Sequence, residues 1–194
     1  MKKKFLLLMI LLLMPIISFA LVSPNPLLGG KLDRGVGRVS YYIDYPSGAG
    51  FYEYQIIAAH NGWEYTGWNN PIYMVAASSN WGTMVDFYAK TNEQVIYETG
   101  LYGVLAYTGF YNINGVQQNP YSDYRYTEIV INDGLNHDRE ETLIKATLLH
   151  ELGHAFGMDE NNGNAYSIMA QTWARNVQTV QKCDNDAIIT IYGW

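Results

Sequence analysis

Residues 138–157 restrict what this chain can fold into more than any other stretch, because their apolar side chains repeat with the period of a helix. Ile144, Leu148 and Leu152 recur every four residues, as a stripe that faces a core does. Gly157 follows the stripe, and glycine tolerates the left-handed conformation in which many helices end. The segment therefore predicts a helix that lies against the core and stops near Gly157.

The same helix carries polar residues at fixed positions. Asp138 and Glu141 have the spacing of a capping box, which predicts that the helix begins near Asp138. His150 and His154 are also four residues apart, at about 200° around the helix axis from Leu152. We therefore expect the two histidines to face away from the core.

His150, Glu151 and His154 form the pattern H-E-x-x-H. Side chains four residues apart on a helix lie about 5–6 Å from each other, so both imidazoles can bind one ion. Neutral imidazole suits Zn²⁺, and zinc that keeps an open position lowers the pKa of a bound water to about 7. Glu151 is then placed to act as the general base towards that water. A histidine pair without a metal is the alternative interpretation.

Residues 1–20 have the layout of a secretory signal peptide. Lysines at positions 2–4 precede an apolar run over residues 5–19, and residues 18–20 have the small-x-small pattern of a cleavage site. The run is shorter than the roughly 20 residues that a membrane span needs, and Pro15 interrupts it. We therefore expect a secreted, extracellular protein with no stable membrane association after cleavage.

The remaining residues suit one domain with its own core. Of the 12 Lys and Arg residues, three lie in the leader, which leaves 9 against 18 Asp and Glu residues. This acidity argues against nucleic acid or an anionic membrane as a partner. Cys183 is the single cysteine, so no disulfide can form within the chain.

Local patterns predict the order of the elements. Strand-like runs occupy residues 38–45, 71–77, 84–90, 103–111 and 127–133. A first helix is predicted within residues 50–68, and its apolar stripe is expected to consist of Tyr54, Ile57, Ala58 and Trp63. A last helix is predicted over residues 184–192, and residues 21–37 are expected to form a loose lead-in to a domain over residues 38–194. This order predicts an α+β fold with a mixed sheet backed by helices.

The segment from His150 to Met169 resembles the active-site region of the metzincin zinc proteases. Their pattern is H-E-x-x-H-x-x-G-x-x-H with a later Met-turn, and the H-E-x-x-H residues and Gly157 fall on it. Ser167-Ile168-Met169 is similar to the Met-turn. The resemblance implies a zincin-like domain with a mixed twisted sheet, an edge strand, an active-site helix, a Met-turn and a C-terminal helix.

The rest of the chain more loosely resembles the matrixin branch of that family. The runs that carry this likeness are GVLAYT (103–108), TEIVIN (127–132), VDFYAK (85–90) and DNDAIITIYGW (184–194). Matrixins usually have a prosegment that contains a cysteine, and residues 21–37 contain none. Outside the motif only His60 and His137 remain, so the family's histidine-rich structural zinc site is not expected, and both side chains should be packed or solvated.

The third metal ligand is where the chain departs from the family. The residue three positions after Gly157 is Glu160, where the family has His or sometimes Asp. A carboxylate oxygen is a competent zinc ligand, so the resemblance implies a site made of His150, His154 and Glu160. Asp159 is the alternative to Glu160. A thermolysin-type site, with a glutamate from a later helix, is disfavoured because no glutamate follows Glu160.

The resemblance implies a secreted zinc endopeptidase. One catalytic Zn²⁺ would activate water, Glu151 would act as general base, and Met169 would form the floor beneath the metal. We expect a monomer whose partner is a protein or peptide substrate, and calcium binding is left open. Gln171 stands where astacin-like members carry a tyrosine, so no such extra ligand is implied. The alternative function is a secreted zinc-binding or adhesive domain with this fold and little catalysis.

The resemblance also places the substrate. The strand that includes Val104, Leu105, Ala106 and Tyr107 would pair with an extended peptide through main-chain hydrogen bonds. Residues 170–182 would wall the pocket beyond the cleaved bond, with Trp173 as a lining residue.

Overall fold

The computed structural model describes residues 25–194. The predicted signal peptide and its cleavage site lie outside these residues. Among the described residues, no helix is both long enough and apolar enough to cross a membrane.

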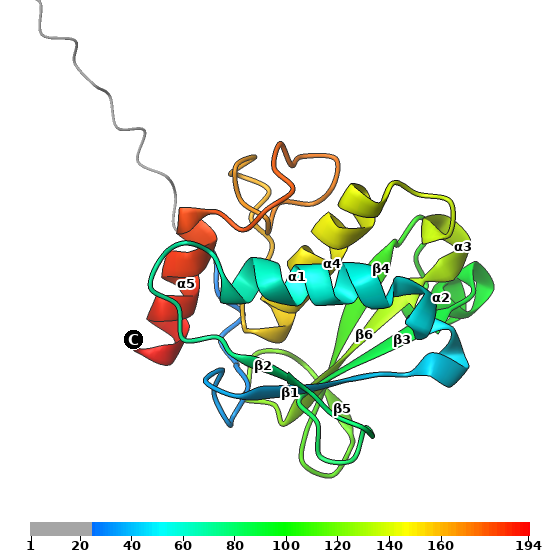
Figure 1. Ribbon diagram of the computed structural model, residues 1–194, viewed down its shortest axis with the longest axis horizontal. Helices are drawn as coiled ribbons and strands as arrows, with labels where there is room; N and C mark the ends of the chain where they lie inside the picture. The colour runs from blue at the N-terminus through cyan, green and yellow to red at the C-terminus, as the bar shows by residue number, and fades with distance from the viewer. Residues whose placement is uncertain (1–24) are drawn as a thin grey trace, which may run out of the picture.

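A six-stranded sheet in the order β2-β1-β3-β6-β4-β5 forms the centre of the molecule (Figure 1). Its strands are β1 (Val39–Ile43), β2 (Met74–Ala76), β3 (Val85–Lys90), β4 (Ala106–Tyr111), β5 (Gln117–Gln118) and β6 (Tyr126–Asn132). The first four strands in the sheet order are parallel, and β4 runs antiparallel to both β6 and β5. The predicted α+β fold with a mixed sheet is therefore confirmed.

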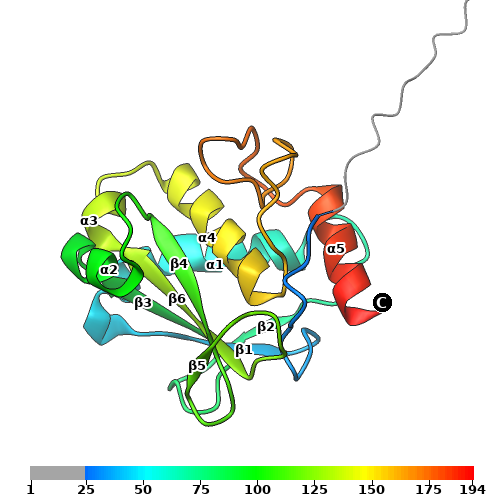
Figure 2. The same cartoon turned by 180° about the vertical axis from the view of Figure 1, so that it is seen from behind.

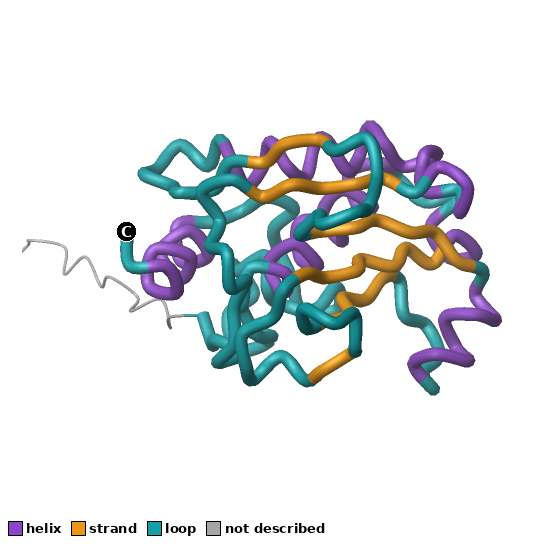
Figure 3. The backbone as a smooth tube through the Cα atoms, turned by 90° about the horizontal axis from the view of Figure 1, so that it is seen from below, coloured by secondary structure: helices purple, strands orange, loops and turns teal. Residues whose placement is uncertain are grey.

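Two long helices, α1 (Glu53–Glu64) and α4 (Glu141–Ala155), lie side by side against the sheet (Figures 1 and 2). The indole Nε1 of Trp63 in α1 donates a hydrogen bond to the main-chain oxygen of Leu149 in α4, at 2.9 Å. The last helix, α5 (Lys182–Tyr192), lies beyond one end of the strands (Figure 3). The Tyr192 hydroxyl donates to the Phe156 carbonyl, at 3.2 Å, and so joins α5 to the end of α4.

The structure adds short elements that local patterns did not predict. These are the 3₁₀ turns η1 (Tyr45–Ser47) and η2 (Ala49–Tyr52), the helices α2 (Asn92–Thr99) and α3 (Asp133–Asn136), and β5. α2 had a readable signal, because Thr91 and Gln94 form a capping box in which each side chain accepts a hydrogen bond from the other residue's main-chain N–H. α3 is too short to show a helical period.

The predicted apolar stripe of α1 is correct for Trp63 and wrong for Tyr54 and Ile57. Tyr54 is 72 % exposed and Ile57 is 39 % exposed, whereas Ile56, Ala59 and Trp63 are fully buried. Neighbouring apolar pairs allowed either phase. The buried set of Ile56, Ala59 and Trp63 has spacings of three and four residues, as one face of a helix does. It also ends at Trp63, which is the largest side chain to bury.

The start of α4 also differs from the prediction. The helix begins at Glu141, and its N-cap, Glu140, makes no side-chain capping bond. Asp138 lies instead in the turn that follows α3, so the predicted capping box does not form. The end of the helix is as predicted: Gly157 has a φ of +98° and turns the chain away.

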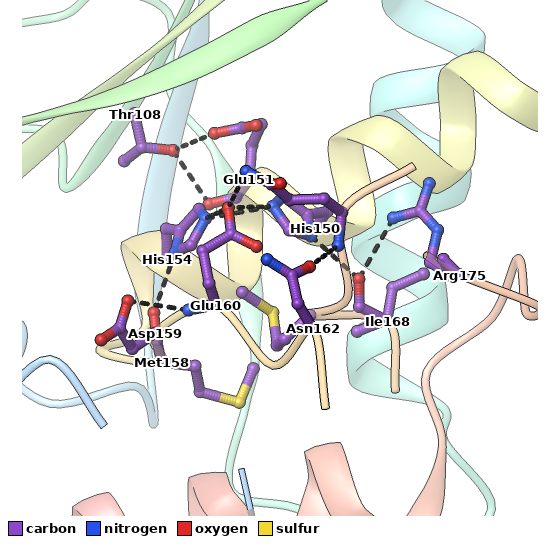
Figure 4. Close-up of polar contacts among 12 residues, drawn as sticks. Thr108, His150, Glu151, His154, Met158, Asp159, Glu160, Asn162, Ile168 and Arg175 are labelled. Atoms are coloured by element: carbon purple, nitrogen blue, oxygen red, sulfur yellow. Dashed lines mark hydrogen bonds and ion pairs between the residues drawn. The ribbon is translucent and has the colours of Figure 1, made fainter. Parts of the chain in front are cut away.

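α4 is buried around most of its circumference, and the side with the histidines, predicted to face away from the core, is itself covered by another part of the chain. His150 is only 7 % exposed, as buried as the neighbouring Glu151. The reason is tertiary, because the loop that follows Gly157 folds back over the histidine face (Figure 4).

The N-terminal segment is packed onto the domain and is not a loose lead-in. Leu32 and Val36 belong to the core. Leu27 forms a β-bridge with Met158, and Leu32 forms one with Tyr124. Residues 25–37 therefore fold with the domain that was expected to begin at residue 38.

Candidate metal centre

α4 and the loop after Gly157 bring three of the predicted ligands together (Figure 4). The Nε2 atoms of His150 and His154 lie 3.1 Å apart, with the ring planes at 88° to each other. The Glu160 Oε1 atom lies 3.4 Å from the first Nε2 and 3.6 Å from the second. Three donor atoms thus form a nearly equilateral triangle.

The size of this triangle fits a tetrahedral zinc ion. With bonds of about 2.0–2.1 Å, tetrahedral geometry places neighbouring ligand atoms about 3.3 Å apart. The three separations of 3.1, 3.4 and 3.6 Å lie around that value. His₂-carboxylate is also a ligand set that catalytic zinc uses, with its fourth position open.

Hydrogen bonds to main-chain oxygens orient the two imidazoles. Nδ1 of His150 lies 2.9 Å from the Ile168 carbonyl, and Nδ1 of His154 lies 2.9 Å from the Met158 carbonyl. A carbonyl oxygen only accepts, so both Nδ1 atoms carry the proton and, in the neutral rings, both Nε2 atoms present lone pairs. Two lone pairs that face each other repel unless a cation lies between them.

Glu160 brings a negative charge and a free hydrogen-bond acceptor next to the two histidine Nε2 atoms. Its Oε2 atom is buried without a hydrogen-bond partner among residues 25–194. Burial alone would raise the pKa of Glu160, but the adjacent imidazoles of His150 and His154, where protonated, outweigh it and lower the pKa to about 2. Burial likewise acts to lower the pKa of His154, yet the Glu160 hydrogen bond and the charge of Glu151 leave it raised. The site thus favours positive charge.

Asp159, the alternative third ligand, is turned away from the histidines. Its Oδ1 atom accepts a hydrogen bond from the Glu160 main-chain N–H, at 2.8 Å. Within the described part of the chain, the cluster of metal-ligating atoms contains Glu160 and does not contain Asp159. The geometry therefore favours Glu160.

Glu151 is held in place by a residue that sequence reasoning did not find. The Thr108 hydroxyl, on β4, donates a hydrogen bond to Glu151 Oε2, at 2.8 Å (Figure 4). Glu151 is only 6 % exposed, and it lines both cavities beside the site. Thr108 is remote from Glu151 in sequence, and no local pattern links the two residues.

Met169 lies beneath α4 and is fully buried. A Cβ atom added at Gly153 would collide with the Met169 Sδ atom and would lie 2.9 Å from the Met158 Cε atom. The absence of a side chain at Gly153 is therefore what lets the two methionines approach the helix. The turn of Ser167, Ile168 and Met169 is fixed from α5, because Asp184 accepts hydrogen bonds from the Ser167 hydroxyl and the Ile168 N–H.

A cleft runs past the site along β4. A cavity of about 410 Å³ on one side contains Val104, Leu105, Ala106 and Trp173, and a cavity of about 270 Å³ contains Tyr107. Both cavities share Ala106, Glu151 and Glu160, so they meet at the triangle of donor atoms. All five residues predicted to contact substrate thus line this cleft.

Two further residues in the cleft were not singled out as site residues. The Gln171 side chain donates to Glu160 Oε1, at 3.4 Å, and accepts from the Trp173 indole, at 2.8 Å. Arg175 donates to the Ile168 carbonyl, at 3.1 Å. Both lie in the segment 170–182 that was predicted to wall a pocket. Gln171 had been noted as the residue at the astacin-like tyrosine position and not as a ligand, and no spacing rule distinguishes Arg175 from its neighbours.

No protein-family model matches the sequence, and a search of curated proteins finds no match. Among solved structures, the chain is similar to high choriolytic enzyme 1, a hatching enzyme zinc-protease from Oryzias latipes (medaka fish). The TM-score is 0.47 and the identity 16 %, over 84 % of this chain and 92 % of that chain. So distant a likeness supports no inference on activity, and the assignment to the matrixin branch stays a prediction.

Proposed function

We propose that this chain is a secreted zinc-dependent endopeptidase of the metzincin type. The observation that carries the proposal is the triangle of His150 Nε2, His154 Nε2 and Glu160 Oε1, which has the dimensions of a tetrahedral zinc site. The proposed secretion rests on the leader pattern in residues 1–20.

His150, His154 and Glu160 would hold the metal. When bound, zinc supplies a Lewis acid that polarises a carbonyl and acidifies water. Glu151 takes a proton from the attacking water and passes it to the leaving amine, as a general base that becomes a general acid. Thr108 fixes the carboxylate for both transfers through its hydrogen bond to Oε2.

The shape of the cleft supports cleavage within a chain rather than at its end. The two cavities lie on either side of Glu151 and Glu160, so a peptide can extend in both directions from the site. Within residues 25–194, β5 pairs only with Phe110 and Tyr111 of β4, so the residues from Ala106 to Gly109 have one edge with no strand partner there. An extended substrate can add to that edge as a strand.

The test is cleavage of an unstructured protein by the zinc-loaded mature chain, with and without a chelator. We expect cleavage that the chelator stops. Glu151→Gln should keep zinc and lose about 10²–10⁴-fold in kcat, because an amide cannot accept the proton. Cleavage that survives complete zinc removal, or full activity of Glu151→Gln, would contradict the proposal.

The same experiment addresses the alternative of a binding domain with little catalysis. Such a domain would bind zinc but cleave nothing, and its wild-type and Glu151→Gln forms would behave alike. A buried Glu151 carboxylate with its own hydrogen-bond donor has no evident use in a domain of that kind.

A further inference from the structure

The larger cavity of the cleft contains a guanidinium group beside the metal centre. Arg175 lines this cavity together with Thr147, His150 and Trp173. It donates to the Ile168 carbonyl at 3.1 Å, and the same oxygen accepts from Nδ1 of His150 at 2.9 Å (Figure 4). A shared acceptor therefore fixes Arg175 next to one of the ligand rings.

Arg175 makes no direct ion pair within the described residues 25–194. The ion pairs found there, at N···O distances up to 4.0 Å, do not include Arg175. Of its five N–H donors, the hydrogen bond to Ile168 uses one. A half-buried guanidinium with free donors and no carboxylate partner is unusual, because burial of a charge is costly unless an opposite charge compensates it.

A second guanidinium reinforces the positive potential at this place. Arg139 donates to the Thr147 hydroxyl, at 3.0 Å, and Thr147 lines the same cavity. Burial, first, and the nearby charge of Arg139 lower the pKa of Arg175, whereas the charges of Glu151, Glu160 and Asp184 raise it. The guanidinium stays protonated at any physiological pH. Arg139 takes part in none of the ion pairs of the described chain either.

We propose that this cavity binds a carboxylate of the substrate through Arg175, which makes Arg175 a specificity-determining residue. A guanidinium binds a carboxylate with two parallel N–H···O bonds, and Arg175 has the free donors for such a pair. The inference rests on the proposed peptidase function, in which residues 170–182 line the pocket beyond the cleaved bond. The carboxylate then belongs to a Glu or Asp side chain at the first position after that bond, or to a nearby chain end.

The experiment compares peptides that differ only at this position. One pair carries Glu or Gln there, and a second pair ends shortly after it with a free carboxylate or an amide. For the wild-type protein we expect kcat/KM to be about 10- to 100-fold higher for Glu than for Gln, as for a hydrogen-bonded pair of charges. If the free chain end provides the carboxylate, the second pair shows the preference instead.

The variants separate recognition from a structural role of Arg175. Arg175→Gln should reduce the Glu-to-Gln ratio of kcat/KM to nearly one, and Arg175→Lys should keep part of it. Arg38→Gln removes the same charge from an exposed position away from the cavity and should keep the wild-type ratio. A merely structural role would lower kcat/KM for both peptides and leave their ratio unchanged. Zinc content is measured for each variant.

Equilibrium binding makes the inference testable apart from catalysis. In the zinc-loaded Glu151→Gln protein, the acidic peptide should bind at least about 10-fold more tightly, and adding Arg175→Gln should abolish the difference. Equal binding and equal cleavage of all the peptides would overturn the carboxylate site and leave the peptidase proposal intact. Preferential binding without any cleavage by the wild-type protein would support the site and contradict the peptidase.

Discussion

Gly153 lies inside α4 between the two histidines, where alanine would normally stabilise a helix. Alanine is favoured over glycine by about 1 kcal/mol in a helix interior. Here the added methyl group would collide with the Met169 Sδ atom and come within 2.9 Å of the Met158 Cε atom. Packing should therefore reverse the ordinary effect of the substitution.

We expect Gly153→Ala to lower the free energy of unfolding by about 1–3 kcal/mol, the usual cost of an overfilled core. Asn61→Ala, at an exposed position of α1, is the control and should show the ordinary gain in helix propensity. Urea unfolding of both variants beside the wild type measures this. If Gly153→Ala proves more stable than the wild type, then Met169 does not pack against Gly153 as described.

Individual residues were predictable where the relevant geometry is local. The histidine pair and Gly157 follow from the period and the end of one helix, so spacing alone placed them correctly. Thr108 and Arg175 reach the site from other segments through tertiary packing, and nothing in their own neighbourhoods marks them. Glu160 was placed by resemblance, and the approach of its Oε1 atom to both histidines is a feature of the folded chain.

Among the elements, α1 holds a buried histidine against the sheet. His60 is 3 % exposed, and its Nε2 atom has no hydrogen-bond partner in the described chain. Its ring meets the edge of Tyr41, with the centroids 3.9 Å apart. Burial lowers the pKa of His60 to about 3, so the folded protein keeps the ring neutral.

This pKa shift makes folding sensitive to acid. An unfolded chain takes up the proton near the ordinary pKa of about 6.5, whereas the folded chain resists it down to about 3. Buried His60 therefore costs almost no stability above about pH 6.5. Below that pH the free energy of unfolding falls, by about 2 kcal/mol at pH 5. His60→Phe should remove this loss, and the exposed His137→Gln should not.

The measurement is the free energy of unfolding at about pH 7.5 and about pH 5 for each protein. On going from about pH 7.5 to about pH 5, we expect the free energy of unfolding of the wild type to fall by about 2 kcal/mol more than that of His60→Phe. Using the difference cancels the contribution of the metal ligands. A difference that does not change with pH would show that His60 titrates as an exposed histidine does.

The elements that local patterns predicted best are the long or strongly periodic ones. The five predicted strands and the two later helices exist close to the expected positions. Errors arose where tertiary contacts decide, as in the phase of α1 and in residues 25–37. The local sequence of that segment predicts a loop, yet its main chain is hydrogen-bonded to the turn after α4. The Leu28 N–H donates to the Gly157 carbonyl, and the Asp159 N–H donates to the Pro26 carbonyl.

At the scale of the molecule, segments from across the described chain converge on the metal centre. β4 supplies Thr108, α4 supplies three of the motif residues, and the loop after Gly157 supplies Glu160. The N-terminal segment and α5 hold that loop from behind, since Asn25 donates to Asp184 at 2.6 Å and accepts from Asn161. The fold thus fixes the third ligand through contacts that sequence spacing cannot show.

The central claim is that His150, His154 and Glu160 form one zinc site, and zinc affinity tests it most directly. The dissociation constant is measured by competition with a chelating dye for the wild type, Glu160→Ala and Asp159→Ala. We predict that Glu160→Ala weakens binding by more than about 100-fold, because only the histidine pair remains. Asp159→Ala removes only an acceptor for the Glu160 N–H and should weaken binding by less than about 10-fold. Normal zinc affinity in Glu160→Ala together with a large loss in Asp159→Ala would contradict the account.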